Sequence, residues 1–212
     1  MTGQTKFPDD IAALLPPTLG KIGSVVFFAT LFSLANPDRD GYNEFRKCHG
    51  NCINGILHAI GMPLAVSGVF LIVRSVADSA IFTRHIQIVV TTAYLGLYLT
   101  NGNAVSAISP WIFYIIYMSI FEFVLYQQLY SNPKWNRTMF LIRGITLIAV
   151  NVGALETIGH GVFEGHHSYV SEFFNSVFHT PLYGINSVLL STGMVDVSTN
   201  STSDLASHHV CW

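Results

Sequence analysis

The chain has 212 residues, of which 50% are hydrophobic and only 10% are charged. Soluble domains carry about 25% charged residues, so this composition excludes an ordinary soluble domain and favours a multi-pass membrane protein. The net charge of -2 lacks the basic excess that nucleic-acid binding requires. Three cysteines are too few for a disulfide framework, and Cys48, His49 and Cys52 lack the second Cys/His pair of a zinc finger.

Residues 1–41 predict an N-terminal lead-in that contains one short helix. The apolar run from Ile22 to Ala35 has 14 residues. A transmembrane helix needs roughly 20, so we expect an interfacial or half-inserted helix here. The turn-forming residues from Asn36 to Gly41 end it.

Residues 42–192 predict a membrane domain of four core spans. The first span runs from Ile56 to Val73 and is kinked at Pro63. The uncharged run from Ile86 to Phe121 divides at the Asn101–Asn103 turn into spans two and three. Span four runs from about Met139 to Phe163. The expected fold is therefore an all-α, multi-pass transmembrane helical bundle.

One more uncharged run, Phe173 to Val195, contains Pro181. It predicts either a fifth span or a helix packed over the bundle. The stretch from Ser198 to Ser207 is rich in Ser and Thr, so residues 193–212 predict a flexible C-terminal tail.

Histidines stand near the ends of two distant spans, where ionisable side chains are costly and usually serve a site. His58 lies at the start of span one and His160 at the end of span four. An even number of crossings returns the chain to the same membrane face. The two histidines are therefore predicted to meet in one metal site.

The first motif contains His49, Asn54 and His58. The two histidines are nine residues apart, which places them on opposite sides of a continuous helix. They can share a metal only if the chain bends, as Gly50 and Gly55 permit. Asn54 and His58 share a face, so Asn54 could hold a ring nitrogen of His58 or a substrate oxygen. The alternative is a packed core histidine and an ordinary surface histidine.

The second motif places Glu156, His160, Glu164 and His167 at i, i+4, i+8 and i+11, which is one stripe of an α-helix. The alternative is a membrane-surface helix with solvated polar groups. Glu156 fits that alternative poorly because it lies inside an apolar run. We expect it to have a partner, either as a neutral hydrogen-bond donor or as a carboxylate beside a metal-bound histidine.

With these motifs, the chain resembles the membrane-bound 2-hydroxy fatty acid dioxygenase family over roughly residues 42–190. The first family motif is matched by His49, Asn54, His58, Gly61 and Pro63, and the second by Gly159, His160, Gly161, Phe163 and Glu164. The family pattern has Gln where this chain has Glu156, so the resemblance favours a Glu156→Gln variant that keeps its metal.

The resemblance implies an Fe(II)-dependent enzyme of the endoplasmic reticulum membrane. It would use O2 to cleave the C1–C2 bond of a long-chain 2-hydroxy fatty acid, leaving a fatty acid one carbon shorter. The expected metal ligands are His49, His58, His160 and His167, the expected catalytic residues are Asn54 and Glu164, and Arg46 and Lys47 are expected to meet the substrate carboxylate. The competing class is a non-enzymatic transporter or lipid-binding scaffold. Iron bound to the purified protein would favour the enzyme over this class. A di-iron desaturase or hydroxylase is a third class, but its closely spaced histidine boxes are missing.

Overall fold

The computed structural model describes residues 15–34, 51–100, 104, 106–132, 134–164 and 173–194. Its elements are the α-helices α1 (Pro17–Leu34), α3 (Cys52–Ala77), α4 (Ala80–Thr100), α5 (Ser109–Ser119), α6 (Arg137–Val150) and α7 (Phe173–Ser191), and the π-helical segments η2 (Ile120–Tyr130), η3 (Asn151–Glu156) and η4 (Gly159–Glu164). Within these ranges no strand occurs, so the predicted all-α class is confirmed.

Four helical stretches are long and apolar enough to cross a membrane: Pro17–Leu34, Ile53–Ala77, Ser109–Gln127 and Arg137–Phe163. Two of these are single helices, and the other two join an α-helix to the π-helical segments that follow it. This set confirms the predicted multi-pass bundle.

The set differs from the predicted spans at two places. Helix α1 has 18 residues, because it already begins at Pro17, a residue that suits the first turn of a helix. Its length and composition thus suffice for a span, where the sequence predicts a half-inserted helix. Helix α4, the predicted second span, is 21 residues long but is not one of the four, since it carries Arg84, His85 and Gln87 near its start.

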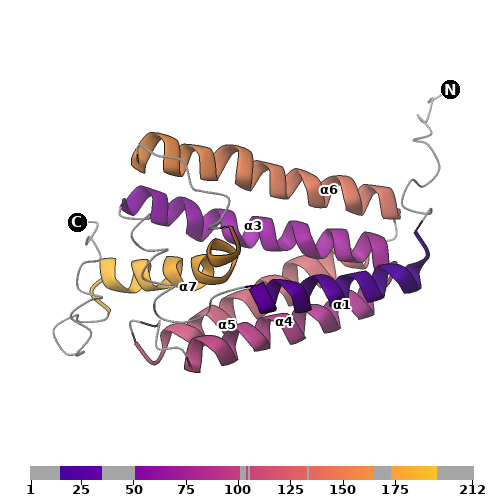
Figure 1. The fold of residues 1–212 in the computed structure, drawn as a ribbon, viewed down its shortest axis with the longest axis horizontal. Coiled ribbons are helices and arrows are strands. Elements are labelled where there is room, and N and C mark those ends of the chain that lie inside the picture. Colours follow the sequence, from indigo (N-terminus) through magenta and orange to yellow (C-terminus); the bar gives the residue numbers. More distant parts are fainter. Residues whose placement is uncertain are drawn as a thin grey trace.

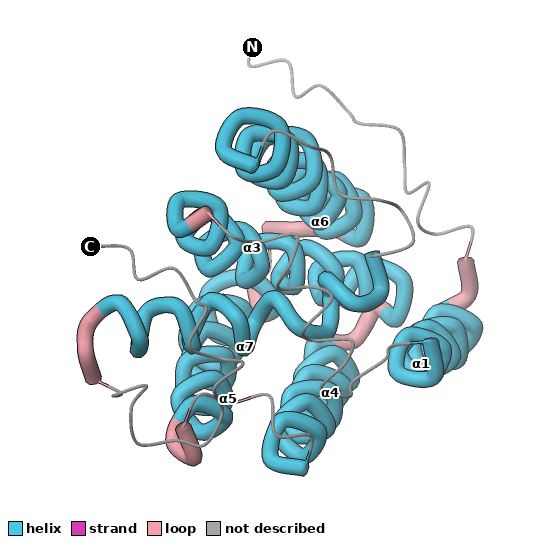
Figure 2. The backbone as a smooth tube through the Cα atoms, turned by 60° about the vertical axis from the view of Figure 1, so that its left-hand side comes forward, coloured by secondary structure: helices cyan, strands magenta, loops and turns pink. Residues whose placement is uncertain are grey.

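Helix α3 lies at the centre of the bundle (Figures 1 and 2). Helix α6 runs along one side of α3, and α7, α5 and α4 lie on the other side. The chain passes along the bundle four times between the start of α3 and the end of η4, so these two points lie at the same end (Figure 1). Helix α7 packs against α3 and α5, which matches the predicted helix packed over the bundle.

Residues at heptad spacing on α3, two of them glycines, line its contact with α6, η3 and η4. The contact has four successive layers, which pair Asn54 with Gly159, Gly61 with Asn151, Gly68 with Gly144, and Ser75 with Arg137. A Cβ on Gly68 would lie 2.6 Å from the carbonyl oxygen of Gly144, so the two backbones almost touch. Such close approach is how helices gain packing energy in lipid, where no hydrophobic effect drives them together.

The spacing along this seam changes where the π-helical segments begin. Successive seam residues are seven apart from Arg137 through Gly144 to Asn151, but Gly159 follows after eight. A π-helix takes up an extra residue, and such insertions are frequent at functional sites. The residues between Asn151 and Gly159 are thereby rotated relative to an uninterrupted α-helix, and Glu156 is one of them.

Candidate metal centre

Asn51 ties together the two helix ends that build the site. Its side-chain oxygen caps α3 by accepting a hydrogen bond from the backbone N–H of Ile53 at 2.9 Å. Its side-chain nitrogen donates to the carbonyl oxygen of Phe163 in η4 at 3.2 Å. One residue thus fixes the start of α3 against the end of η4.

His58 is buried in the second turn of α3, with 2% of its surface exposed. Its Nδ1 lies 2.9 Å from the backbone carbonyl oxygen of Asn54. A carbonyl oxygen only accepts, so Nδ1 carries the proton, and in the neutral ring the lone pair is on Nε2. Metal-binding histidines are commonly held in this way by a backbone carbonyl.

Glu156 and His160 face this lone pair from η3 and η4. The Glu156 Oε2 atom lies 3.3 Å from His58 Nε2 and 3.5 Å from His160 Nε2. The two imidazole rings are perpendicular to each other, with centroids 5.2 Å apart. One ligand atom from each residue lies within 4.8 Å of the others, so the group could hold a metal ion.

The electrostatics of this arrangement favour a cation. The lone pair of His58 Nε2 points at a carboxylate oxygen, and two acceptors in contact repel each other unless a proton or a cation lies between them. Both histidines are buried and only 23% of the Glu156 side chain is exposed, so water relieves little of this repulsion. Two imidazoles and one carboxylate are also the donor set of non-haem Fe(II) sites, so these residues fit the expected metal.

The structure brings some of the predicted site residues together. His58 and His160 meet, as the even number of passes along the bundle predicts. Asn54 is fully buried beside them, but its backbone carbonyl, not its side chain, holds the ring nitrogen of His58. The Asn54 side-chain oxygen lies instead against Gly159 in the seam.

The remaining predicted site residues lie outside the described residues. They are His49, His167, Arg46 and Lys47, together with the side chain of Glu164, whose backbone ends η4. Their proposed roles stay predictions.

Glu156 was not among the predicted metal ligands. The expectation that it has a partner is confirmed, since it lies beside both histidines. Its i, i+4 spacing to His160 inside an apolar run indicated a role at the site. The prediction did not make it a ligand because the family pattern has Gln at this position.

A comparison with known proteins adds no further constraint on this centre. No family model matches the chain, and no curated protein or solved structure is detectably similar to it.

Proposed function

We propose that this protein is a membrane-embedded Fe(II)-dependent dioxygenase that cleaves long-chain 2-hydroxy fatty acids in the endoplasmic reticulum. The observation that carries the proposal is the convergence of His58, Glu156 and His160 within 4.8 Å at one end of an apolar helical bundle. Buried ionisable groups in membrane helices rarely serve structure alone. The resemblance of both motifs to the dioxygenase family supports the choice of reaction.

The protein's own residues prepare the site for a cation. Asn54 fixes the tautomer of His58, Asn51 holds the two helix ends together, and Glu156 supplies the negative charge. When bound, Fe(II) would supply O2 activation and a positive charge that attracts the hydroxyl and carboxylate of the substrate. The low polarity around the buried histidines strengthens this attraction, because it weakens screening by water.

The proposed reaction balances with O2 as the only oxidant. The substrate loses its C1–C2 bond, C2 rises to the level of a carboxylic acid, and C1 leaves as carbon dioxide. The electrons released reduce O2, whose oxygen atoms are distributed among the shortened acid, carbon dioxide and water. Arg46 and Lys47 are proposed to bind the substrate carboxylate.

The test is metal analysis followed by turnover. Protein purified in detergent is loaded with Fe(II) without oxygen, freed of excess metal, and incubated with O2 and a long-chain 2-hydroxy fatty acid. We expect stoichiometric iron and a product one carbon shorter that contains oxygen from labelled O2. The same fatty acid without the 2-hydroxyl group is the control and should remain intact. Iron-free protein, or iron-loaded protein without the shortened product, would contradict the proposal.

A proton-coupled transporter is the second candidate, and one observation favours it. A carboxylate between two imidazoles inside a membrane is also the chemistry of a proton relay. In that case the purified protein would hold no metal, and in liposomes a pH gradient would drive proton flux that Glu156→Gln abolishes.

A further inference from the structure

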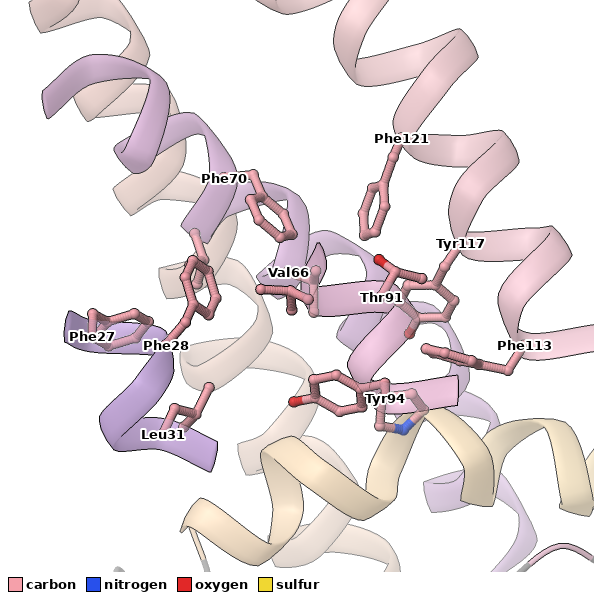
Figure 3. A pocket seen from close by; sticks show the side chains of 13 residues that line it. Phe27, Phe28, Leu31, Val66, Phe70, Thr91, Tyr94, Phe113, Tyr117 and Phe121 are labelled. Carbon is pink, nitrogen blue, oxygen red and sulfur yellow. The ribbon is translucent and has the colours of Figure 1, made fainter. Parts of the chain in front are cut away.

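An apolar cavity of about 160 Å³ lies between α1, α3, α4, α5, η2 and α7, and its lining residues include no histidine. Aromatic rings form most of its wall (Figure 3). Phe27, Phe28 and Leu31 of α1 close one side of it, and Phe113, Tyr117 and Phe121 of α5 and η2 close the opposite side. Almost no polar atom is exposed to it, so water gains no partners inside.

The cavity is aligned with the metal centre along α3. Its wall includes Val66 and Val69, which are eight and eleven residues beyond His58. Met62, buried at 6% exposure, stands halfway at i+4 from His58 and i−4 from Val66, so it shares their face of the helix. Met62 therefore contributes a flexible thioether to the stretch of α3 between His58 and the cavity.

The cavity also approaches the lipid side of the bundle. Phe27 contributes to its wall, yet 50% of the Phe27 surface is exposed. Helix α1 is packed on both sides of this point, since Gly20 lies against the backbone of Val76 and the Phe28 ring stacks on Phe70. The exposed faces of these spans contact acyl chains in a membrane, so hydrocarbon is the material available to fill the space.

We propose that this cavity binds one hydrocarbon chain, taken from the bilayer beside Phe27, and that it is the tail site for the substrate of the metal centre. The second half of this statement rests on the proposed function. It makes the substrate a single-chain amphiphile, with its polar head at His58, Glu156 and His160. Empty space inside a bundle forfeits dispersion contacts, and a chain restores them without any polar partner.

The experiment uses a saturated fatty acid with a diazirine near its methyl end, added to the full chain in phosphatidylcholine nanodiscs. After photolysis, the labelled residues are mapped by mass spectrometry. We expect label on the cavity wall, chiefly around Val66 and Phe113. Label confined to lipid-facing side chains such as Ile115 and Phe123, which are 62% exposed, would overturn the proposal.

A matched pair of variants on α4 tests the space itself. Val90 lines the cavity at 8% exposure, whereas its neighbour Val89 is 63% exposed and faces outward. Val90→Phe should reduce labelling of the cavity wall by about tenfold, because the added ring occupies part of the space, and Val89→Phe should not change it. If Val90→Phe does not fold, Val66→Leu makes a smaller addition and should reduce labelling by about threefold. Folded cavity variants that label like the wild type would overturn the proposal.

Iron content, measured on the same samples, separates the two proposals. Both valine variants leave the ligands untouched, so each should keep the iron content of the wild type. If no sample binds iron but Val90→Phe alone loses label, the proposed function fails and the chain site stands. If iron and turnover are normal but the label never reaches the cavity wall, the chain site fails and the proposed function stands.

Discussion

Replacing Glu156 with glutamine removes one charge from the centre and keeps the shape of the side chain. The carboxylate oxygen lies 3.3 Å and 3.5 Å from the two imidazole nitrogens, so a cation held by all three residues also lies close to it. A divalent cation about 4 Å from a carboxylate interacts with it by roughly 8 kcal/mol at an effective dielectric constant of 20. The amide oxygen of glutamine can still bind the ion, so we expect about half of this energy, roughly 4 kcal/mol, to be lost. A loss of that size corresponds to about a thousandfold in affinity.

We therefore expect Glu156→Gln to weaken Fe(II) binding by about 100-fold to 1,000-fold. The lower bound is about the largest effect that is usual for losing a group that only orients a metal ligand. The assay is competition with a chromophoric chelator, without oxygen, on protein in nanodiscs. Glu122→Gln is the matched control, since Glu122 pairs with Arg84 in η2 and α4 and takes no part in the centre. Its dissociation constant for Fe(II) should equal that of the wild type.

An unchanged dissociation constant in folded Glu156→Gln would refute this reasoning. It would show that the side chain acts as a hydrogen-bonding group, as the Gln of the family pattern suggests. The structure favours the other outcome, because an amide oxygen offers a metal no net charge.

Three further outcomes are expected from single substitutions. Gly61→Ala directs a methyl group at the Asn151 side chain, so it should displace η3 and lower the iron occupancy measured by metal analysis. Gly153→Ala is the control and should leave the iron occupancy unchanged, because a Cβ there meets no other group within 4 Å. Gly144→Val should destabilise the seam by about 1–3 kcal/mol, the usual cost of overpacking, which denaturant titration of the folded protein can measure. His160→Ala should abolish both iron binding and turnover, and full iron content in this variant would contradict the ligand assignment. His208→Ala is the control and should change neither, because His208 belongs to the predicted C-terminal tail.

The meeting of the two motifs was predictable from the sequence, whereas the geometry of the centre was not. Counting apolar runs gives an even number of passes, which predicts that His58 and His160 lie at one end of the bundle. In the structure their ring centroids are 5.2 Å apart. The π-helical turns were not predictable, because the stripe through Glu156 and Glu164 was assigned with α-helical periodicity. The π-helical backbone rotates the Glu156 side chain relative to an α-helix, and in this position Glu156 lies beside His58 as well as His160.

The sequence also predicted incorrectly which of the helices α1 and α4 is long and apolar enough to cross a membrane. Counting apolar residues from Ile22 missed the first turn of α1, which Pro17 starts. An uncharged run beginning at Ile86 made α4 look more apolar than it is, since the helix begins six residues earlier and includes Arg84. A count of apolar residues therefore misses the first turn that Pro17 adds to α1 and the charge that Arg84 adds to α4.

The polar groups of α4 have consequences for how the chain enters the membrane. Arg84 forms a two-pronged pair with Glu122, at 2.9 Å and 3.0 Å, and Gln87 donates to the hydroxyl of Tyr130 at 2.6 Å. Both partners belong to η2, so α4 alone would present an arginine and an amide to lipid without them. Placing α4 in a bilayer would therefore cost less free energy once η2 is present to pair with Arg84 and Gln87.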